Sequence, residues 1–88
     1  MPVQSMNSYD CFNGKPVSVI ASYNAKGDFI PIYVKINGEV LKIVSAVLVS
    51  SVGRRVYKFR CEIQDGQYIK NLHLTYFKED SIWMMPWK

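Results

Sequence analysis

The stretch FIPIYVKINGEVLKI, residues 29–43, predicts a β-hairpin and sets the fold class. Asn37-Gly38 lies between two segments of alternating hydrophobicity, and a two-residue type I′ turn needs the positive φ angles that these two residues tolerate. Apolar residues before the turn share one parity, which is the period of a strand with one buried face. They are Ile30, Ile32, Val34 and Ile36.

The turn fixes the register of this hairpin. It places Val34 opposite Leu41 and Ile32 opposite Ile43 on the inner face, with Tyr33 opposite Lys42 outside. Pro31 cannot donate to a ladder, so we expect its amide side to face an edge or a bulge.

Segments of similar pattern flank the hairpin, at residues 16–23, 40–51, 54–63, 68–76 and 82–85. The segment 40–51 is apolar on both parities around Val47, which predicts a strand that bends and is covered on both sides. Asp65-Gly66 predicts a second two-residue turn. Its register pairs Ile63 with Tyr68, Phe59 with Leu72 and Tyr57 with Leu74 inside, and Arg60 with Asn71, Lys58 with His73 and Val56 with Thr75 outside.

The order of these strands predicts an all-β fold. We expect a small antiparallel meander barrel, SH3-like or related, of five to six strands, because closure removes exposed edges. An open sheet packed on itself is the alternative. Residues 1–15 lack periodicity and predict a flexible N-terminal arm, which leaves residues 16–88 as one barrel domain.

Composition indicates where the protein works, the state of its thiols and the classes of partner that its charge permits. No apolar run reaches the roughly 18 residues of a membrane span, and the N-terminus lacks a secretory pattern, so we expect a cytoplasmic protein with no membrane contact. Cys11 and Cys61 are expected to be two free thiols. The net charge of +4 permits contact with nucleic acid or an acidic protein.

No motif predicts catalysis, a metal or a cofactor. His73 is the single histidine, and the two cysteines lack the spacing of a zinc site or a nucleophile motif. The glycines stand singly between strands, so no phosphate-binding loop is present. An enzyme assembled from His73, Cys61 and Glu62 is the third and least favoured hypothesis.

Two groups of residues are candidates for binding. Cations and polar groups on an outer strand face suit phosphates and stacked bases, although a solvated face explains the same pattern. These residues are Arg54, Lys58, Arg60, His73, Lys42 and Tyr33. Aromatic and sulfur-bearing side chains near the C-terminus suit a protein partner or a second copy, although core packing is favoured for them. These residues are Phe77, Trp83, Met85 and Trp87.

The pattern also resembles a group of small proteins of Gram-positive anaerobes. The resemblance covers residues 16–85 and is carried by Val17-x-Val19-x-Ala21-x-Tyr23, Gly27-x-Phe29-Ile30-Pro31-Ile32-Tyr33, Lys42-Ile43, Val47-Leu48-Val49, Tyr57-x-Phe59-x-Cys61-x-Ile63 and Leu72-x-Leu74-x-Tyr76 with Trp83. It implies a small barrel in a bacterial cytoplasm and supplies no activity or site.

The favoured function is a non-enzymatic binding module that engages a macromolecule, a protein first of all. Nucleic-acid binding through the basic strand face is the alternative.

Overall fold

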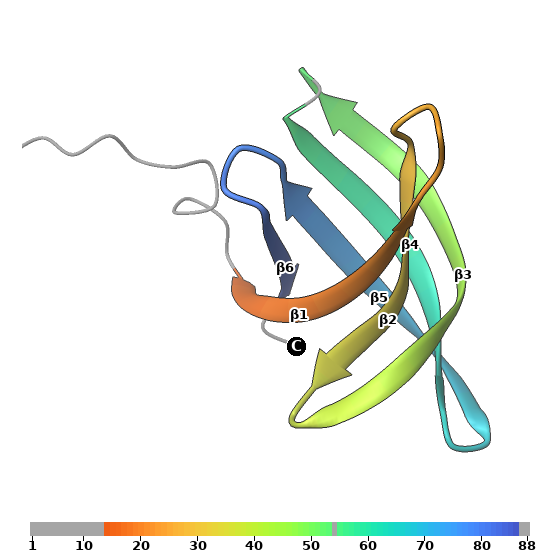
Figure 1. The fold of residues 1–88 in the computed structure, drawn as a ribbon. Helices are drawn as coiled ribbons and strands as arrows, with labels where there is room; N and C mark the ends of the chain where they lie inside the picture. The colour runs from red at the N-terminus through yellow and green to blue at the C-terminus, as the bar shows by residue number, and fades with distance from the viewer. Residues whose placement is uncertain (1–13, 54, 87–88) are drawn as a thin grey trace, which may run out of the picture.

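The computed structural model describes residues 14–53 and 55–86, which form a closed antiparallel barrel (Figure 1). Neighbouring strands follow chain order, and β1 pairs with β6 to close the ring. The all-β meander barrel predicted from the sequence is confirmed. Its strands are β1 Gly14–Tyr23, β2 Phe29–Ile36, β3 Glu39–Val52, β4 Val56–Asp65, β5 Tyr68–Phe77 and β6 Ile82–Pro86.

The β2–β3 turn forms as the sequence predicts. Asn37 and Gly38 have φ angles of 52° and 80°, as a type I′ turn requires. Val34 pairs with Leu41 and Tyr33 with Lys42, which confirms the register next to the turn.

A bulge in β2 changes the parity that the sequence suggested. Ile20 pairs with Tyr33, but Ala21 pairs with Pro31, so Ile32 is an extra residue in the β1–β2 ladder. Pro31 is therefore buried and Ile30 is exposed, the reverse of the predicted parity. The β2–β3 ladder ends at Tyr33–Lys42, so the predicted pair of Ile32 with Ile43 is wrong, whereas the predicted bulge at the proline is confirmed.

The β4–β5 hairpin turns one residue later than predicted, which shifts each strand partner by two residues. Asp65 pairs with Tyr68, so the central residues are Gly66 and Gln67, and Gly66 supplies a φ of 64° at the first central position. A shift of two residues preserves parity, so the residues predicted to share a face still do although the partners change. Two burial predictions are wrong, since Tyr68, expected inside, is exposed and Thr75, expected outside, is buried. The observed pairs include Ile63–Lys70, Cys61–Leu72, Arg60–His73, Phe59–Leu74, Lys58–Thr75, Tyr57–Tyr76 and Val56–Phe77.

The long strand β3 bends but is not covered on both sides. Its register against β4 shifts around Val44 and again around Val49, which confirms the predicted bend. Four of its apolar side chains nevertheless stay between 44% and 49% exposed, so the prediction of double coverage is wrong. They are Val44, Val47, Leu48 and Val49.

The core fills the barrel with aliphatic and aromatic side chains. Phe29 is central to the aromatic part, since its ring lies 5.1 Å from that of Tyr57 and 5.2 Å from that of Tyr76. The Trp83 ring stacks 4.7 Å from Tyr76. The buried cluster comprises Val34, Leu41, Ile43, Phe59, Cys61, Ile63, Leu72, Leu74, Trp83 and Met85.

Strand β1 changes partner halfway along its length. Its first residues, Gly14–Val17, pair with β6, and Ser18–Tyr23 pair with β2. The strand begins at Gly14, two residues before the predicted domain boundary. The rest of the predicted N-terminal arm, residues 1–13, lies outside the described residues.

Candidate functional site

The outer face of β4 brings together part of the predicted basic cluster. Arg60 lies in register between Val47 on β3 and His73 on β5. Lys58 lies in the same way between Ser50 and a buried Thr75. Arg54 lies outside the described residues. Lys58, Arg60 and His73 therefore share one exposed patch.

The other predicted members of the cluster lie further along the barrel. Lys42 is paired with Tyr33 and with Gln64, and Gln64 is four positions along β4 from Arg60. Glu62 projects between them, in register with Ser45. The structure thus separates Tyr33 and Lys42 from the Arg60 patch by a carboxylate.

The cations of this face have no ion-pair partner among the described residues. Surface ion pairs in this part of the chain join Lys70 to Asp65 at 2.9 Å and Arg55 to Glu79 at 3.5 Å. Lys58 and Arg60 take part in neither. Their charge is available to a ligand.

Three of the four residues proposed for partner contact are buried in the fold. Phe77, Trp83 and Met85 are each no more than 8% exposed. Trp83 and Met85 belong to the buried cluster. Trp87 lies outside the described residues. In this structure the first three pack against neighbouring strands, and their role toward a partner stays a prediction.

The exposed apolar run of β3 lies next to the Arg60 patch. We call Val44, Val47, Leu48 and Val49 the β3 apolar run. The sequence indicates the run, because no charged residue occurs between Ile43 and Gly53, but its pattern predicted burial on both sides. A group of exposed large aliphatic side chains is typical of an interaction surface.

A cavity of about 210 Å³ opens where β2 and β3 separate. The β2–β3 ladder covers only Glu39–Lys42 of β3, and beyond it Phe29 and Leu48 face the same cavity from the two strands. Tyr57 and Phe59 line it from β4, and Gly27 and Asp28 line its rim. This cavity is called the β2–β3 cavity.

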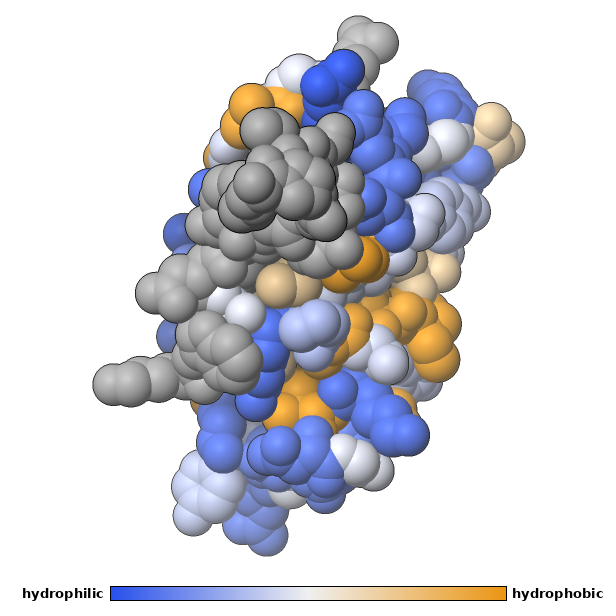
Figure 2. Space-filling view, turned by 90° about the vertical axis from the view of Figure 1, so that its left-hand side faces the viewer, coloured by the Kyte–Doolittle hydropathy of each residue, from blue (hydrophilic) through white to orange (hydrophobic). Residues whose placement is uncertain are grey.

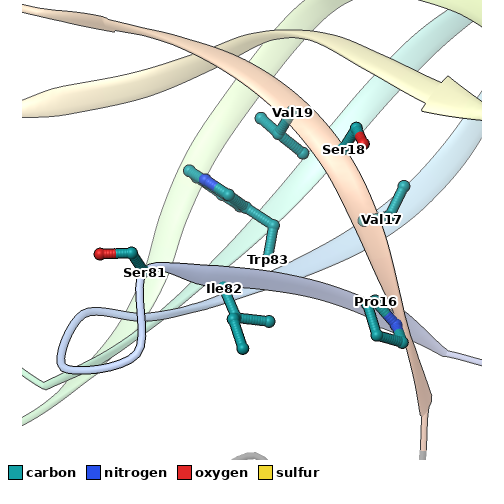
Figure 3. Close-up of a pocket in the computed structure, with 7 residues that line it drawn as sticks. All are labelled: Pro16, Val17, Ser18, Val19, Ser81, Ile82 and Trp83. Atoms are coloured by element: carbon teal, nitrogen blue, oxygen red, sulfur yellow. The ribbon is translucent and has the colours of Figure 1, made fainter.

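A second hollow, of about 430 Å³, lies where β1 leaves β6 (Figure 3). Trp83 extends from β6 toward Val19 on β1, and Ile82 points the other way. The remaining lining residues are Pro16, Val17, Ser18 and Ser81. These groups do not titrate near neutral pH, and the hydroxyls of Ser18 and Ser81 have no histidine or carboxylate beside them in the lining to act as a base.

Cys61 and His73, two of the residues considered for catalysis, lie apart in the structure. Burial raises the pKa of the Cys61 thiol to about 11, which keeps it protonated and a poor nucleophile. No three histidine, cysteine or acidic side chains gather at a metal site within residues 14–53 and 55–86. His73 lies outside the barrel and Cys61 inside it, so the two do not form a pair.

Comparisons with known proteins found no matching family model, no similar curated protein and no similar solved structure. In the described part of the chain, no helix is long and apolar enough to cross a membrane.

Proposed function

We propose that this domain is a non-enzymatic module that binds a partner protein through the β3 apolar run and the adjoining cations of β4. The observation that carries the proposal is the exposure of four large aliphatic side chains in a segment of β3, residues 43–52, that contains no charged residue. Val47 is paired directly with Arg60, so an exposed aliphatic side chain lies beside a cation on the outer face. Such a surface fits a partner that offers aliphatic and acidic side chains.

The composition of the surface favours protein over nucleic acid. Proteins that bind single strands stack bases on exposed aromatic rings, whereas the β3 residue paired with Arg60 is the aliphatic Val47. Glu62 follows Arg60 on the same face and would repel phosphates. A partner protein gains from burying the aliphatic row, while a nucleic acid leaves it in water.

Nucleic-acid binding is the second candidate, and one observation supports it. Arg60 and His73 face each other across two strands, with Lys58 beside them and no ion pair on either cation. Nucleic-acid binding through these cations predicts an affinity for oligonucleotides that falls steeply as the salt concentration rises.

Fluorescence anisotropy with two classes of probe tests the proposal. The probes are short peptides that alternate leucine or valine with glutamate, and single-stranded and duplex oligonucleotides, each at low and near-physiological salt. We expect saturable binding of the peptides that persists at physiological salt. Binding of oligonucleotides alone would replace the proposal by the second candidate.

Charge-reversal variants locate the surface in the same assay. Lys58→Glu/Arg60→Glu is expected to weaken the peptide at least tenfold. Lys26→Glu/Lys78→Glu makes the same change in net charge in two loops, and is expected to leave binding within twofold. Equal losses in both variants would show that net charge, and not this surface, attracts the peptide.

The proposal includes the expected setting of the domain. A small barrel of SH3-like type that works in the bacterial cytoplasm is consistent with the buried, free Cys61 thiol.

A further inference from the structure

We infer that the partner binds as an extended strand that pairs with the open edge of β3 at Ser45–Leu48 and inserts a side chain into the β2–β3 cavity. This inference rests on the proposed function and names how the partner is held. It follows from the ladders, the bulges, the cavity and the charges around this edge.

The ladders leave one edge of β3 open. Strand β3 pairs with β2 only over Glu39–Lys42, and from Ile43 to Val52 its ladder partner is β4 alone. In the described part of the chain, the backbone on the β2 side of this segment therefore lacks a strand partner. Unpaired N–H and C=O groups in a row are a template for an added strand. The two strands separate visibly above their turn in Figure 1.

Apart from its two bulges, the edge carries none of the side chains that usually protect against pairing. Natural edge strands carry lysine, proline or inward-pointing charges that discourage a second chain. The segment 43–52 reads IVSAVLVSSV and contains none of them. By contrast, the paired part of β3 carries Glu39 and Lys42. An unprotected apolar edge is a liability unless a partner covers it.

The two bulges limit where an added strand fits. Register shifts around Val44 and Val49 twist the strand and interrupt a regular ladder. Ser45–Leu48 lies between them in unbroken register with β4, from Ser45–Glu62 to Leu48–Phe59. At about 3.3 Å per residue this segment spans roughly 13 Å. The partner segment is therefore short, about four to six residues.

The β2–β3 cavity supplies a receptor for one partner side chain. Ala46 and Leu48 pair with Cys61 and Phe59, which are buried, so this parity of β3 faces the interior. A strand beside β3 turns alternate side chains the same way, into the space lined by Phe29, Leu48 and Tyr57. The lining is aromatic and aliphatic, so a leucine, methionine or phenylalanine fits it.

The other parity of the partner strand faces solvent beside Val47. The cations of β4, Lys58 and Arg60, lie one strand further on this outer face. Strands lie about 4.8 Å apart, so a glutamate on the partner reaches toward Arg60 across β3. The partner is thus an extended segment with large apolar residues at alternate positions and an acidic residue between or beside them.

A second face of the barrel is a weaker candidate for the same role. The side of the molecule where β6 lies carries a mixture of hydrophobic patches and hydrophilic residues (Figure 2). Ser18–Tyr23 of β1 also lack a partner on the β6 side, next to the hollow that contains Trp83. No unpaired cation and no row of exposed aliphatic side chains lies among the lining residues of that hollow.

The test uses the full chain and three versions of one capped peptide. The parent peptide has seven residues, with leucine and valine at alternate positions and glutamate and threonine between them. Two further versions carry N-methyl groups on one or the other alternate set of amides. An added strand directs only one alternate set of N–H groups to β3. We expect methylation of one set to reduce affinity at least tenfold and methylation of the other to leave it within threefold.

Amide chemical-shift mapping and two variants place the peptide. We expect the largest shifts at Ser45–Leu48 and Phe29. Val47→Lys, on the open edge, is expected to weaken the parent peptide at least tenfold. Val40→Lys is the matched control, because Val40 is 58% exposed on the same strand but already pairs with Lys35 of β2.

The outcomes separate this inference from the proposed function. Equal affinity of both methylated peptides, with shifts on β3 and β4, would overturn strand addition and leave a protein-binding surface. Absence of binding by every peptide, with the folded barrel intact, would contradict both. Self-association that is abolished by Val47→Lys, seen by light scattering without peptide, would assign the edge to a second copy and overturn the inference.

Discussion

Leu74 supports the inner wall of the barrel, and its truncation to alanine tests the core directly. The side chain is 0% exposed and lies opposite Phe59 in the β4–β5 ladder. Removing three carbon atoms forfeits about 2.4 kcal/mol of transfer free energy at roughly 0.8 kcal/mol each. The cavity left behind brings the expected loss of unfolding free energy to about 3–4 kcal/mol.

A loss of this size is large for a chain of 88 residues. Domains of this length have about 4–13 kcal/mol of stability, and each kcal/mol lowers Tm by about 4–8 °C. We expect Leu74→Ala to lower the midpoint by roughly 12–30 °C in thermal unfolding followed by circular dichroism. Leu74→Val removes one carbon and is expected to cost about 1 kcal/mol, which keeps the prediction measurable if the alanine variant does not fold.

Ile69 supplies the matched control on the same strand. It is 54% exposed, so Ile69→Ala is expected to cost less than about 1 kcal/mol in urea unfolding. A Leu74→Ala loss within 1 kcal/mol of the Ile69→Ala loss would refute the assignment of Leu74 to the interior.

Three further predictions concern the turn, the thiol and a surface ion pair. Gly38→Ala is expected to cost about 1–2 kcal/mol in urea unfolding, because its φ of 80° strains any L-residue although no atom lies within 4 Å of the added Cβ. In a Cys11→Ser background, Cys61 is expected to react with a thiol reagent at pH 8 only after unfolding, because burial raises its pKa to about 11. The native state keeps this proton between pH 9 and 11 while the unfolded state loses it, so the stability that Cys61 contributes is expected to fall as pH rises through that window. Lys70→Ala is expected to cost less than about 1 kcal/mol in urea unfolding, because the 2.9 Å pair with Asp65 is exposed to solvent and salt; a loss above 2 kcal/mol would contradict this.

The sequence predicted the barrel because its turns and parities agree. Asn37-Gly38 specified one register without tertiary information, since both residues tolerate positive φ. The Asp65-Gly66 prediction placed the turn one residue too early, and so each partner two residues away, because one glycine serves two kinds of turn. It is the second central residue of a type I′ turn or the first of a type II′ turn. Alternation alone cannot decide between the two, since a shift of two residues leaves every side chain on the same face.

The bulges account for the other errors. Alternation assigns Ile30 and Pro31 correctly only if the ladder is unbroken, and an extra residue at Ile32 exchanges their faces. In β3 the apolar residues on both parities indicated burial on both sides. The chain has no second layer to cover them among its described residues, so part of the run stays in water.

The candidate site was predictable in part. Lys58, Arg60 and His73 follow from parity alone, and the structure places them in one patch. The separation of β2 from β3, and with it the open edge and its cavity, depends on where each ladder ends. That is set by strand twist and by the two bulges of β3, for which the sequence carries no signal comparable to Pro31 in β2.

Photo-crosslinking from position 47 shows whether a partner protein contacts the open edge of β3. The full chain, with benzoylphenylalanine in place of Val47, is expressed in the cells from which the gene comes and irradiated. We expect a protein adduct that disappears with Lys58→Glu/Arg60→Glu and does not form when the same group replaces the exposed Ile69 on β5. A nuclease-sensitive adduct at position 47, or equal protein labelling from both positions, would contradict this expectation.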